Sequence, residues 1–271
     1  MFSYKLFDKM IDTMKKIELS YQKNVRDLGG LIAFNGMKVK EGRIYRGGFL
    51  GRVSNDDILK INSLRLTDII DFRSQVEYVN RPDYVFMGVT YHNFPTLADN
   101  TNLKIKAEYD DGNLLWFLDG STDGKLHMRN TYEESLLSKD GIEAYKNFFK
   151  VLVQDENRVV YYHCSQGKDR AGLASYLLEI ALGVSEEDAI KDYLMSNEAM
   201  KLKIKQLKFM LRNKPFYNKE YARALEEVFS ADAEYLNYGL SKVEEQCGSI
   251  ENYLTNVLEV DIDKLRKYYL E

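Results

Sequence analysis

The sequence predicts an α/β fold with a mostly parallel central sheet flanked by helices. Short runs of β-branched, aliphatic and aromatic residues, typical of buried strands, recur at residues 43–46, 66–72, 89–94 and 159–162. Segments with helical spacing of apolar residues lie between these runs. Strands that alternate with helices favour parallel pairing, because a parallel pair needs a long crossover connection.

The helices between the strands are marked by their N-termini. Ser54 precedes a run with acidic residues in its first turn and with apolar residues on one face, namely Ile58, Ile61 and Leu64. Ser74 and Glu77 form a capping-box pattern, and the short helix that they begin ends before Pro82. A further helix is predicted over residues 141–153.

Two segments give weaker patterns. Residues 1–16 place Leu6, Met10, Ile11 and Met14 near helical spacing, which predicts an amphipathic helix docked on the domain. Residues 96–131 contain Asp-Gly turn signals on both sides of Trp116, the only tryptophan of the chain. A long segment of this kind is often functional or mobile.

The second half of the chain is predicted to be helical. One helix follows the strand at 159–162, covers residues 172–182 and ends at Gly183. After it we expect separate helices, over residues 185–194, 197–212 and 218–238, with a break at Lys214-Pro215 between the last two.

The most informative stretch is His163-Cys164-Ser165-Gln166-Gly167-Lys168-Asp169-Arg170-Ala171-Gly172. It joins a predicted strand to a helix N-terminus, where backbone N–H groups and the helix dipole favour an anion. The same field favours a thiolate at Cys164, and the planar guanidinium of Arg170 can grip two oxygens of a phosphate. The alternative is a buried structural cysteine beside a chance arginine, but the surrounding pattern favours a nucleophile.

The spacing of Cys164 and Arg170 resembles the phosphate-binding loop of cysteine-dependent phosphatases. The fuller pattern His-Cys-x-x-Gly-Lys-Asp-Arg is similar to that of the bacterial tyrosine phosphatases that include secreted mycobacterial and listerial enzymes with tyrosine and lipid phosphatase activity. Other stretches carry the same resemblance, at residues 24–30, 45–48, 69–77 and 248–254. It covers the chain from about residue 24 to residue 270.

The resemblance implies one phosphatase domain over residues 1–271. It also implies a helical lid, for which residues 197–240 are the candidate, followed by a closing helical segment over residues 241–271. The candidate lid is locally basic, with Lys201, Lys203, Lys205 and Lys208. These lysines form a solvated helix face or collectively guide an anionic substrate or lipid head group.

The resemblance also implies a two-step reaction without a metal or another cofactor. Cys164 attacks the phosphorus atom, and water then hydrolyses the phosphocysteine. Arg170 and the loop's backbone N–H groups bind the phosphate. The expected phosphate-binding residues are therefore Ser165, Gln166, Gly167, Lys168, Asp169 and Arg170. Gly167 lets the backbone approach the phosphate closely.

The general acid has two candidates. The resemblance favours Asp169 in the loop, whose alternative role is to cap a helix or pair with a neighbouring cation. Asp71, at the carboxyl end of a predicted strand, is the second candidate, and its alternative role is to orient Arg170 or Arg73. His163 faces away from the substrate and orders the loop, with Arg46 and Arg73 as further supporting residues.

Lys168 and Ala171 distinguish this loop. Lys168 either adds charge at the mouth of the pocket, which would extend specificity toward phosphoinositides, or is exposed to solvent. Ala171 stands where the family loops usually have Thr or Ser, so we expect slow hydrolysis of the phosphocysteine. A phosphate-binding module of little or no activity is therefore the alternative function, and sulfur transfer by a rhodanese-like loop is a weaker one.

Composition limits the partners. With 38 basic and 42 acidic residues the net charge is −4, so we expect phosphorylated proteins or phosphoinositides as substrates and no nucleic acid. Cys164 and Cys247 are the only cysteines, which excludes a disulfide framework and favours a reducing compartment. No signal peptide and no run of 18 apolar residues is found, so we expect a cytoplasmic protein, although export by a non-classical route stays open.

Overall fold

A computed structural model describes residues 15–98, 123–212 and 219–271. Within them, five strands form one sheet in the order β1-β2-β5-β3-β4. The strands are β1 Arg26–Asp27, β2 Ile44–Gly48, β3 Asp68–Asp71, β4 Thr90–Asn93 and β5 Val160–Cys164. Strands β2, β5, β3 and β4 pair in parallel, and β1 pairs antiparallel with β2. The predicted α/β fold class is confirmed.

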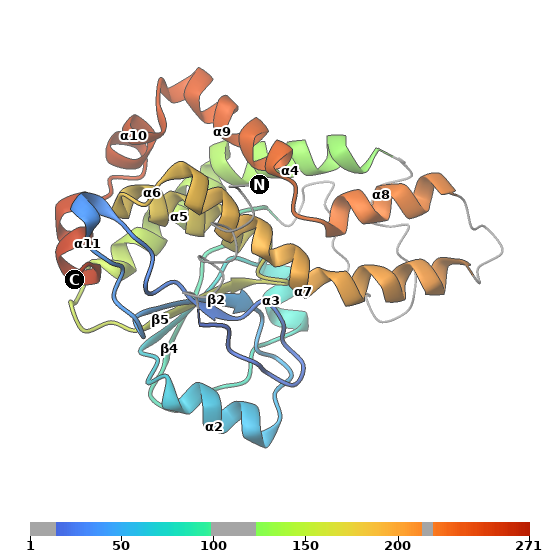
Figure 1. Cartoon of the computed structure of the whole chain (residues 1–271), viewed down its shortest axis with the longest axis horizontal. Helices are drawn as coiled ribbons and strands as arrows, with labels where there is room; N and C mark the ends of the chain where they lie inside the picture. Colours follow the sequence, from blue (N-terminus) through green and yellow to red (C-terminus); the bar gives the residue numbers. More distant parts are fainter. Residues whose placement is uncertain (1–14, 99–122, 213–218) are drawn as a thin grey trace, which may run out of the picture.

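The helices cover both faces of this sheet (Figure 1). They are α2 Asn55–Ser63, α3 Gln75–Asn80, α4 Gly124–Leu137, α5 Lys139–Leu152, α6 Arg170–Leu182, α7 Glu186–Arg212, α8 Lys219–Phe229, α9 Ala233–Cys247, α10 Ile250–Asn252 and α11 Ile262–Tyr269, with a 3-10 turn η1 Phe34–Gly36 and a π-helical turn η3 Tyr253–Val257.

Alternation along the strands divides the core into two clusters. Ile44, Ile70, Val160 and Tyr162 belong to the larger cluster, together with side chains of α4, α5, α6, α7, α9 and α11. Tyr45, Ile69 and Tyr161, the neighbours of these residues along the strands, belong to the smaller cluster, which includes Ile61 of α2. Figure 1 shows α2 alone below the sheet, with α5 and α6 above it. The sheet is therefore buried on both faces, as expected for parallel pairing.

Both predicted N-terminal caps are present. The Ser54 hydroxyl accepts the N–H of Asp57, whose side chain accepts the N–H of Ser54 in return. Ser74 and Glu77 form the same reciprocal pair at the start of α3. Helix α6 ends at Gly183 as predicted, where φ is 85°.

Three differences concern helices. Helix α4 was not predicted, because Asp123 and Gly124 were interpreted as a turn, whereas Asp123 caps the helix. Helix α7 is one continuous helix where a break after residue 194 was expected. The helix expected over residues 218–238 is interrupted: α8 ends at Phe229, and Asp232 caps α9 by accepting the N–H of Glu234.

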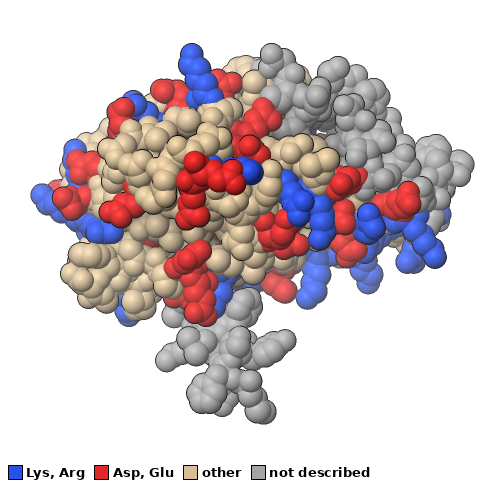
Figure 2. All heavy atoms as spheres, turned by 90° about the horizontal axis from the view of Figure 1, so that it is seen from above, with Lys and Arg blue, Asp and Glu red and all other residues tan. Residues whose placement is uncertain are grey.

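Several sequence predictions lie outside the described residues. They are the amphipathic helix near the N-terminus, the segment around Trp116 and the break at Lys214-Pro215. In the described part of the chain, none of the helices combines the length and the apolar character that a membrane span requires. Acidic and basic side chains are interspersed on the face shown in Figure 2, and basic ones are frequent toward the end formed by α7 and α8.

Candidate active site

Cys164 is the last residue of β5, and residues 165–169 join it to the first turn of α6. The cysteine is buried, in the middle of the sheet between β2 and β3. Among the hydrogen bonds of the described residues, none is donated by the backbone N–H groups of residues 165–170. These donors are therefore available to an anion at the positive end of the α6 dipole.

The loop's carbonyl groups are bound from outside. Asn24 Nδ2 donates to the carbonyl oxygens of Gln166 (3.2 Å) and Gly167 (2.9 Å), and Arg46 Nη2 donates to that of Gly167 (2.8 Å). Gly167 has φ of 68°, and a Cβ there would lie 2.3 Å from the carbonyl carbon and oxygen of Gly47. Only glycine fits this close approach without strain.

A buried charge cluster holds Arg46 in place. Asp192 of α7 accepts hydrogen bonds from both Arg46 and Arg26. Burial alone would raise the pKa of Asp192, but the two guanidinium groups lower it. Glu179 of α6 lies in the same cluster, and burial followed by the charge of Asp192 raises its pKa well above the usual range. The cluster thus fixes the supporting position expected for Arg46.

Arg170 is held by a residue that the sequence analysis assigned only to a helix cap. Its Nη1 and Nη2 donate to the two carboxylate oxygens of Glu77, at 2.6 and 3.2 Å. The Ser165 hydroxyl also donates to Glu77 and lies 3.2 Å from Arg170 Nη2. Burial alone would raise the pKa of Glu77, but these contacts and the N–H of Ser74 lower it to about 2. Glu77 therefore fixes the guanidinium beside the loop.

Arg170 is also linked electrostatically to the cysteine. Burial opposes its charge, yet its pKa is raised above the ordinary value, first by Glu77 and then by the sulfur of Cys164. The guanidinium therefore interacts directly with the charge of the loop's cysteine as well as with Glu77.

Asp169 and Lys168 pair within the loop. Lys168 Nζ lies 2.9 Å from Asp169 Oδ1, and the Tyr132 hydroxyl donates to the same oxygen at 2.8 Å. Lys168 Nζ also donates to the carbonyl oxygens of Val228 (2.6 Å) and Ser230 (3.0 Å), at the end of α8. The Lys168 side chain is 2 % exposed, so it lies neither at the mouth of the pocket nor in solvent, contrary to both expectations. Its ammonium group instead binds carbonyl groups at the end of α8.

Asp71 lies against Arg73, which was one of its two expected roles. Arg73 Nε contacts both carboxylate oxygens of Asp71, at 3.0 and 2.9 Å, and Nη2 contacts Oδ2 at 2.6 Å. The Arg73 N–H also donates to Asp71, at 2.8 Å. Both side chains are buried. This bidentate pair occupies the carboxylate that the alternative assignment used as general acid.

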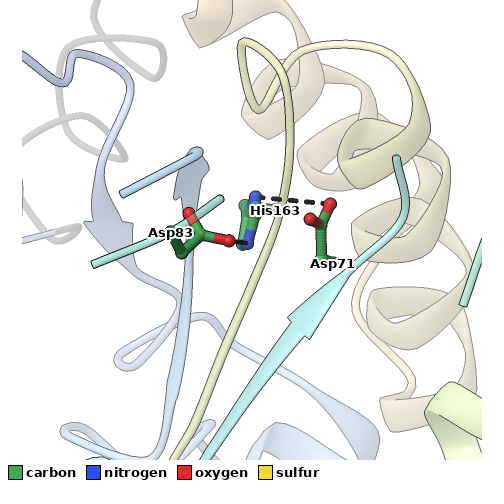
Figure 3. A group of neighbouring side chains, drawn as sticks. All are labelled: Asp71, Asp83 and His163. Carbon is green, nitrogen blue, oxygen red and sulfur yellow. Dashed lines mark ion pairs between the residues drawn. The ribbon is translucent and has the colours of Figure 1, made fainter. Parts of the chain in front are cut away.

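His163 lies between two carboxylates (Figure 3). Its Nε2 is 3.1 Å from Asp83 Oδ2, and its Nδ1 is 3.7 Å from Asp71 Oδ1. Potential ligand atoms of these three residues lie within 4.8 Å of one another, as in a metal site. The guanidinium of Arg73 also bridges Asp71 and Asp83, so a cation already lies between these two carboxylates.

Comparison with known proteins identifies the family. A model of the tyrosine phosphatase family matches residues 17–271. The chain belongs to this family. A candidate tyrosine-protein phosphatase of Cupriavidus necator is 30% identical over 260 residues, which cover 91% of this chain and 85% of that protein. The triple specificity protein phosphatase PtpB of Mycobacterium tuberculosis is 24% identical over 272 residues, with 89% and 98% covered.

Several residues of this tyrosine phosphatase site were missed in the sequence. Asn24 and Glu77 lie in stretches that carried the family resemblance, but no role was assigned to them beyond the cap formed by Glu77. Asp83 directly follows Pro82, and Asp192 lies within α7. Neither aspartate has a local sequence signal, because each acts on a residue distant along the chain.

Proposed function

We propose that this tyrosine phosphatase hydrolyses phosphomonoesters through a phosphocysteine intermediate. The main support is the position of Cys164, at the end of β5 and at the start of the anion loop. In this loop the carbonyl of Gly167 accepts hydrogen bonds from Asn24 and Arg46, while the N–H groups of residues 165–170 donate none among the described residues. An in-line attack needs a buried thiolate and donors that already point at the phosphate oxygens. The loop offers a buried cysteine and unpaired N–H groups, with Arg170 as a fixed cation.

In the first step the Cys164 sulfur bonds to phosphorus while the phosphorus–oxygen bond to the leaving group breaks. Asp169 gives a proton to the leaving oxygen. In the second step a water oxygen bonds to phosphorus, the sulfur–phosphorus bond breaks, and Asp169 takes the proton of the water. Arg170 and the N–H groups of residues 165–170 hold the other phosphate oxygens throughout.

We propose phosphotyrosine as the principal substrate, with phosphoserine, phosphothreonine and phosphoinositide monoesters as further substrates. The groups assembled here bind the phosphate, which all these substrates share. The triple specificity in the name of the mycobacterial relative agrees with this breadth. Because Lys168 is buried against Val228 and Ser230, its side chain is not part of the support for phosphoinositides.

The test is p-nitrophenol release from p-nitrophenyl phosphate after rapid mixing, under reducing conditions with a chelator. We expect a burst near one equivalent followed by slow turnover, because the methyl group of Ala171 cannot stabilise the departing sulfur. Cys164→Ser abolishes release, whereas Cys247→Ser leaves it unchanged. Equal rates in both phases would contradict the effect of Ala171. Release by Cys164→Ser would contradict the mechanism, and no release from wild type would favour a phosphate-binding module.

A further inference from the structure

We propose that Asp83 is a positioning residue for the nucleophile, because its carboxylate holds His163 as an imidazolium whose other N–H fixes the carbonyl of Cys164. The inference rests on the proposed function only in its consequence for catalysis. The arrangement itself involves no reacting atom, so it can be tested separately.

Asp83 gathers contacts from three parts of the chain. Its Oδ1 accepts the N–H of Leu50 at 2.5 Å, just beyond the end of β2. Its Oδ2 lies 3.1 Å from Nη2 of Arg73 and 3.1 Å from Nε2 of His163. Asp83 thus joins the segment after α3 to the ends of β2, β3 and β5, where the anion loop begins.

Both ring nitrogens of His163 face oxygen atoms. Nδ1 lies 3.2 Å from the carbonyl oxygen of Cys164, and Nε2 lies 3.1 Å from the carboxylate of Asp83, at an ion-pair distance but without hydrogen-bond alignment. A carbonyl oxygen and an ionised carboxylate can only accept. A neutral imidazole has a single N–H, so it would leave one lone pair facing an oxygen, whereas an imidazolium presents an N–H to both oxygens.

The charges around the ring favour the same form. His163 faces Asp71 from β3, Asp83 from the segment after α3, Arg73 from the turn after β3, and Tyr161 and Cys164 from its own strand. Burial lowers the pKa of His163 and Arg73 opposes protonation, but Asp83 and Asp71 raise it above the ordinary value of 6.5. The Tyr161 hydroxyl donates to the Gly48 carbonyl, and burial raises its pKa well above 10, so this group stays neutral.

The consequence for the loop is a pH-dependent anchor. The Cys164 carbonyl lies directly before the anion loop, so the N–H of His163 sets the direction in which the loop leaves β5. When the ring loses a proton at alkaline pH, one of its two contacts loses its donor. Removing the Asp83 charge brings this loss to lower pH.

The direct test is a pH titration of histidine side chains by proton–nitrogen correlation NMR. The chain has 3 histidines, so His92→Gln and His127→Gln assign the His163 signals. In wild type we expect both ring nitrogens of His163 still to show mainly imidazolium shifts at pH 6.5, because its pKa is raised above that value. In Asp83→Asn we expect a lower pKa for His163 and a smaller imidazolium fraction at that pH, because the largest source of the raised pKa is gone. Asp56→Asn on the exposed face of α2 is the matched control.

The catalytic test compares kcat/KM of wild type and Asp83→Asn between pH 6 and pH 8. The ratio of the two is expected to grow with pH, by up to about tenfold for each unit by which the His163 pKa falls. A purely structural role would lower the variant equally at every pH. A constant ratio, or a His163 that is mainly neutral in wild type at pH 6.5, would overturn the proposal. If Asp83→Asn does not fold, the titration of wild type still tests whether His163 is an imidazolium. That measurement does not depend on phosphatase activity.

Discussion

Glu77 shows how one side chain serves two structures. It completes the cap of α3 by accepting the N–H of Ser74, and it also binds the fork of Arg170. The cap could be predicted from the spacing of Ser74 and Glu77 alone. The ion pair could not, because its partners are 93 residues apart and meet only when α3 and α6 pack at the same sheet edge.

Glu77→Gln separates these two roles. Glutamine can still complete the cap, because its amide oxygen accepts the N–H of Ser74. It cannot balance the buried Arg170, and breaking such a pair costs about 3–5 kcal/mol. We expect kcat/KM to fall by roughly a hundredfold, since one preorganised group is displaced, and urea unfolding to show reduced stability. The exposed Glu156→Gln is the control, and an unchanged kcat/KM in Glu77→Gln would contradict the role in orienting Arg170.

The assignment of the general acid is tested at the same scale by Asp169→Asn. A p-nitrophenolate departs without a proton, whereas a serine alkoxide needs one, so the variant should lose about 10²–10⁴ on phosphoserine and far less on p-nitrophenyl phosphate. Asp71→Asn should lose activity equally on both substrates, because it disturbs the pair with Arg73. If the substrate-dependent loss occurs in Asp71→Asn instead, Asp71 is the acid.

At the scale of elements, Lys168 ties the anion loop to the joint between α8 and α9. It binds the carbonyls of Val228 and Ser230, while Asn197 of α7 accepts the N–H of Ala231 and donates to its carbonyl, both at 2.8 Å. These contacts fall at the break that replaced the long helix expected over residues 218–238. The candidate lid is therefore joined to the loop by a buried lysine.

Lys168→Met tests this joint. Methionine is a flexible apolar side chain that fills similar space, but it leaves the carbonyl groups of Val228 and Ser230 without this donor and Asp169 without its cation. We expect a loss of about 2–4 kcal/mol in urea unfolding, with protease cleavage between α7 and α9 becoming faster. Lys201→Met on the exposed face of α7 should change neither. Cleavage at the wild-type rate in Lys168→Met would show that the lysine does not hold the joint.

A helix or strand can be predicted from the sequence when the residues that determine it lie within its own segment. Strands β2, β3, β4 and β5 and helices α2, α3 and α6 follow local periodicity and caps, and they were expected nearly in place. Strand β1 has two residues, too few for a pattern, and exists because Arg26 and Asp27 pair with β2. In α4 the first residue, Gly124, packs against Ala224 and Glu227 of α8, and this tertiary contact cannot be seen in the sequence.

For the whole molecule, the parallel sheet decides which residues can meet. The carboxyl ends of β2, β5 and β3 lie side by side and carry Gly48, Cys164 and Asp71. The motif residues around Cys164 could be predicted because they are consecutive. Their supports could not, because Asn24, Glu77, Asp83 and Asp192 come from four separate segments. The net charge of −4 also does not tell how many acidic and basic side chains form ion pairs inside the fold.

These internal pairs predict how the stability of the molecule depends on pH. The pKa values of buried Asp68, Glu77, Asp83 and Asp192 are lowered, with Glu77 at about 2. Each stabilises the fold above its unfolded-state pKa, near about 4, and loses that contribution as the pH falls through its folded value. Glu179 acts in the opposite direction, because its raised pKa penalises the fold once the unfolded chain ionises.

His163 determines how the stability of the fold changes at alkaline pH. Its pKa is raised, so its contribution is complete below about pH 6.5 and is lost as the pH rises through the folded value. Among the buried carboxylates, the lowered pKa values of Asp57, Asp68, Glu77, Asp83 and Asp192 outnumber the raised ones of Asp27 and Glu179. We therefore expect the unfolding temperature to be highest from about pH 5 to pH 7 and to decline on both sides. Thermal unfolding followed by circular dichroism from pH 3 to pH 9 measures this. In Asp83→Asn the unfolding temperature should depend less on pH at both the acidic and the alkaline end, because the variant lacks one carboxylate of lowered pKa and the main partner of the imidazolium. If its unfolding temperature declines at alkaline pH as much as that of wild type, His163 carries no charge in the folded protein.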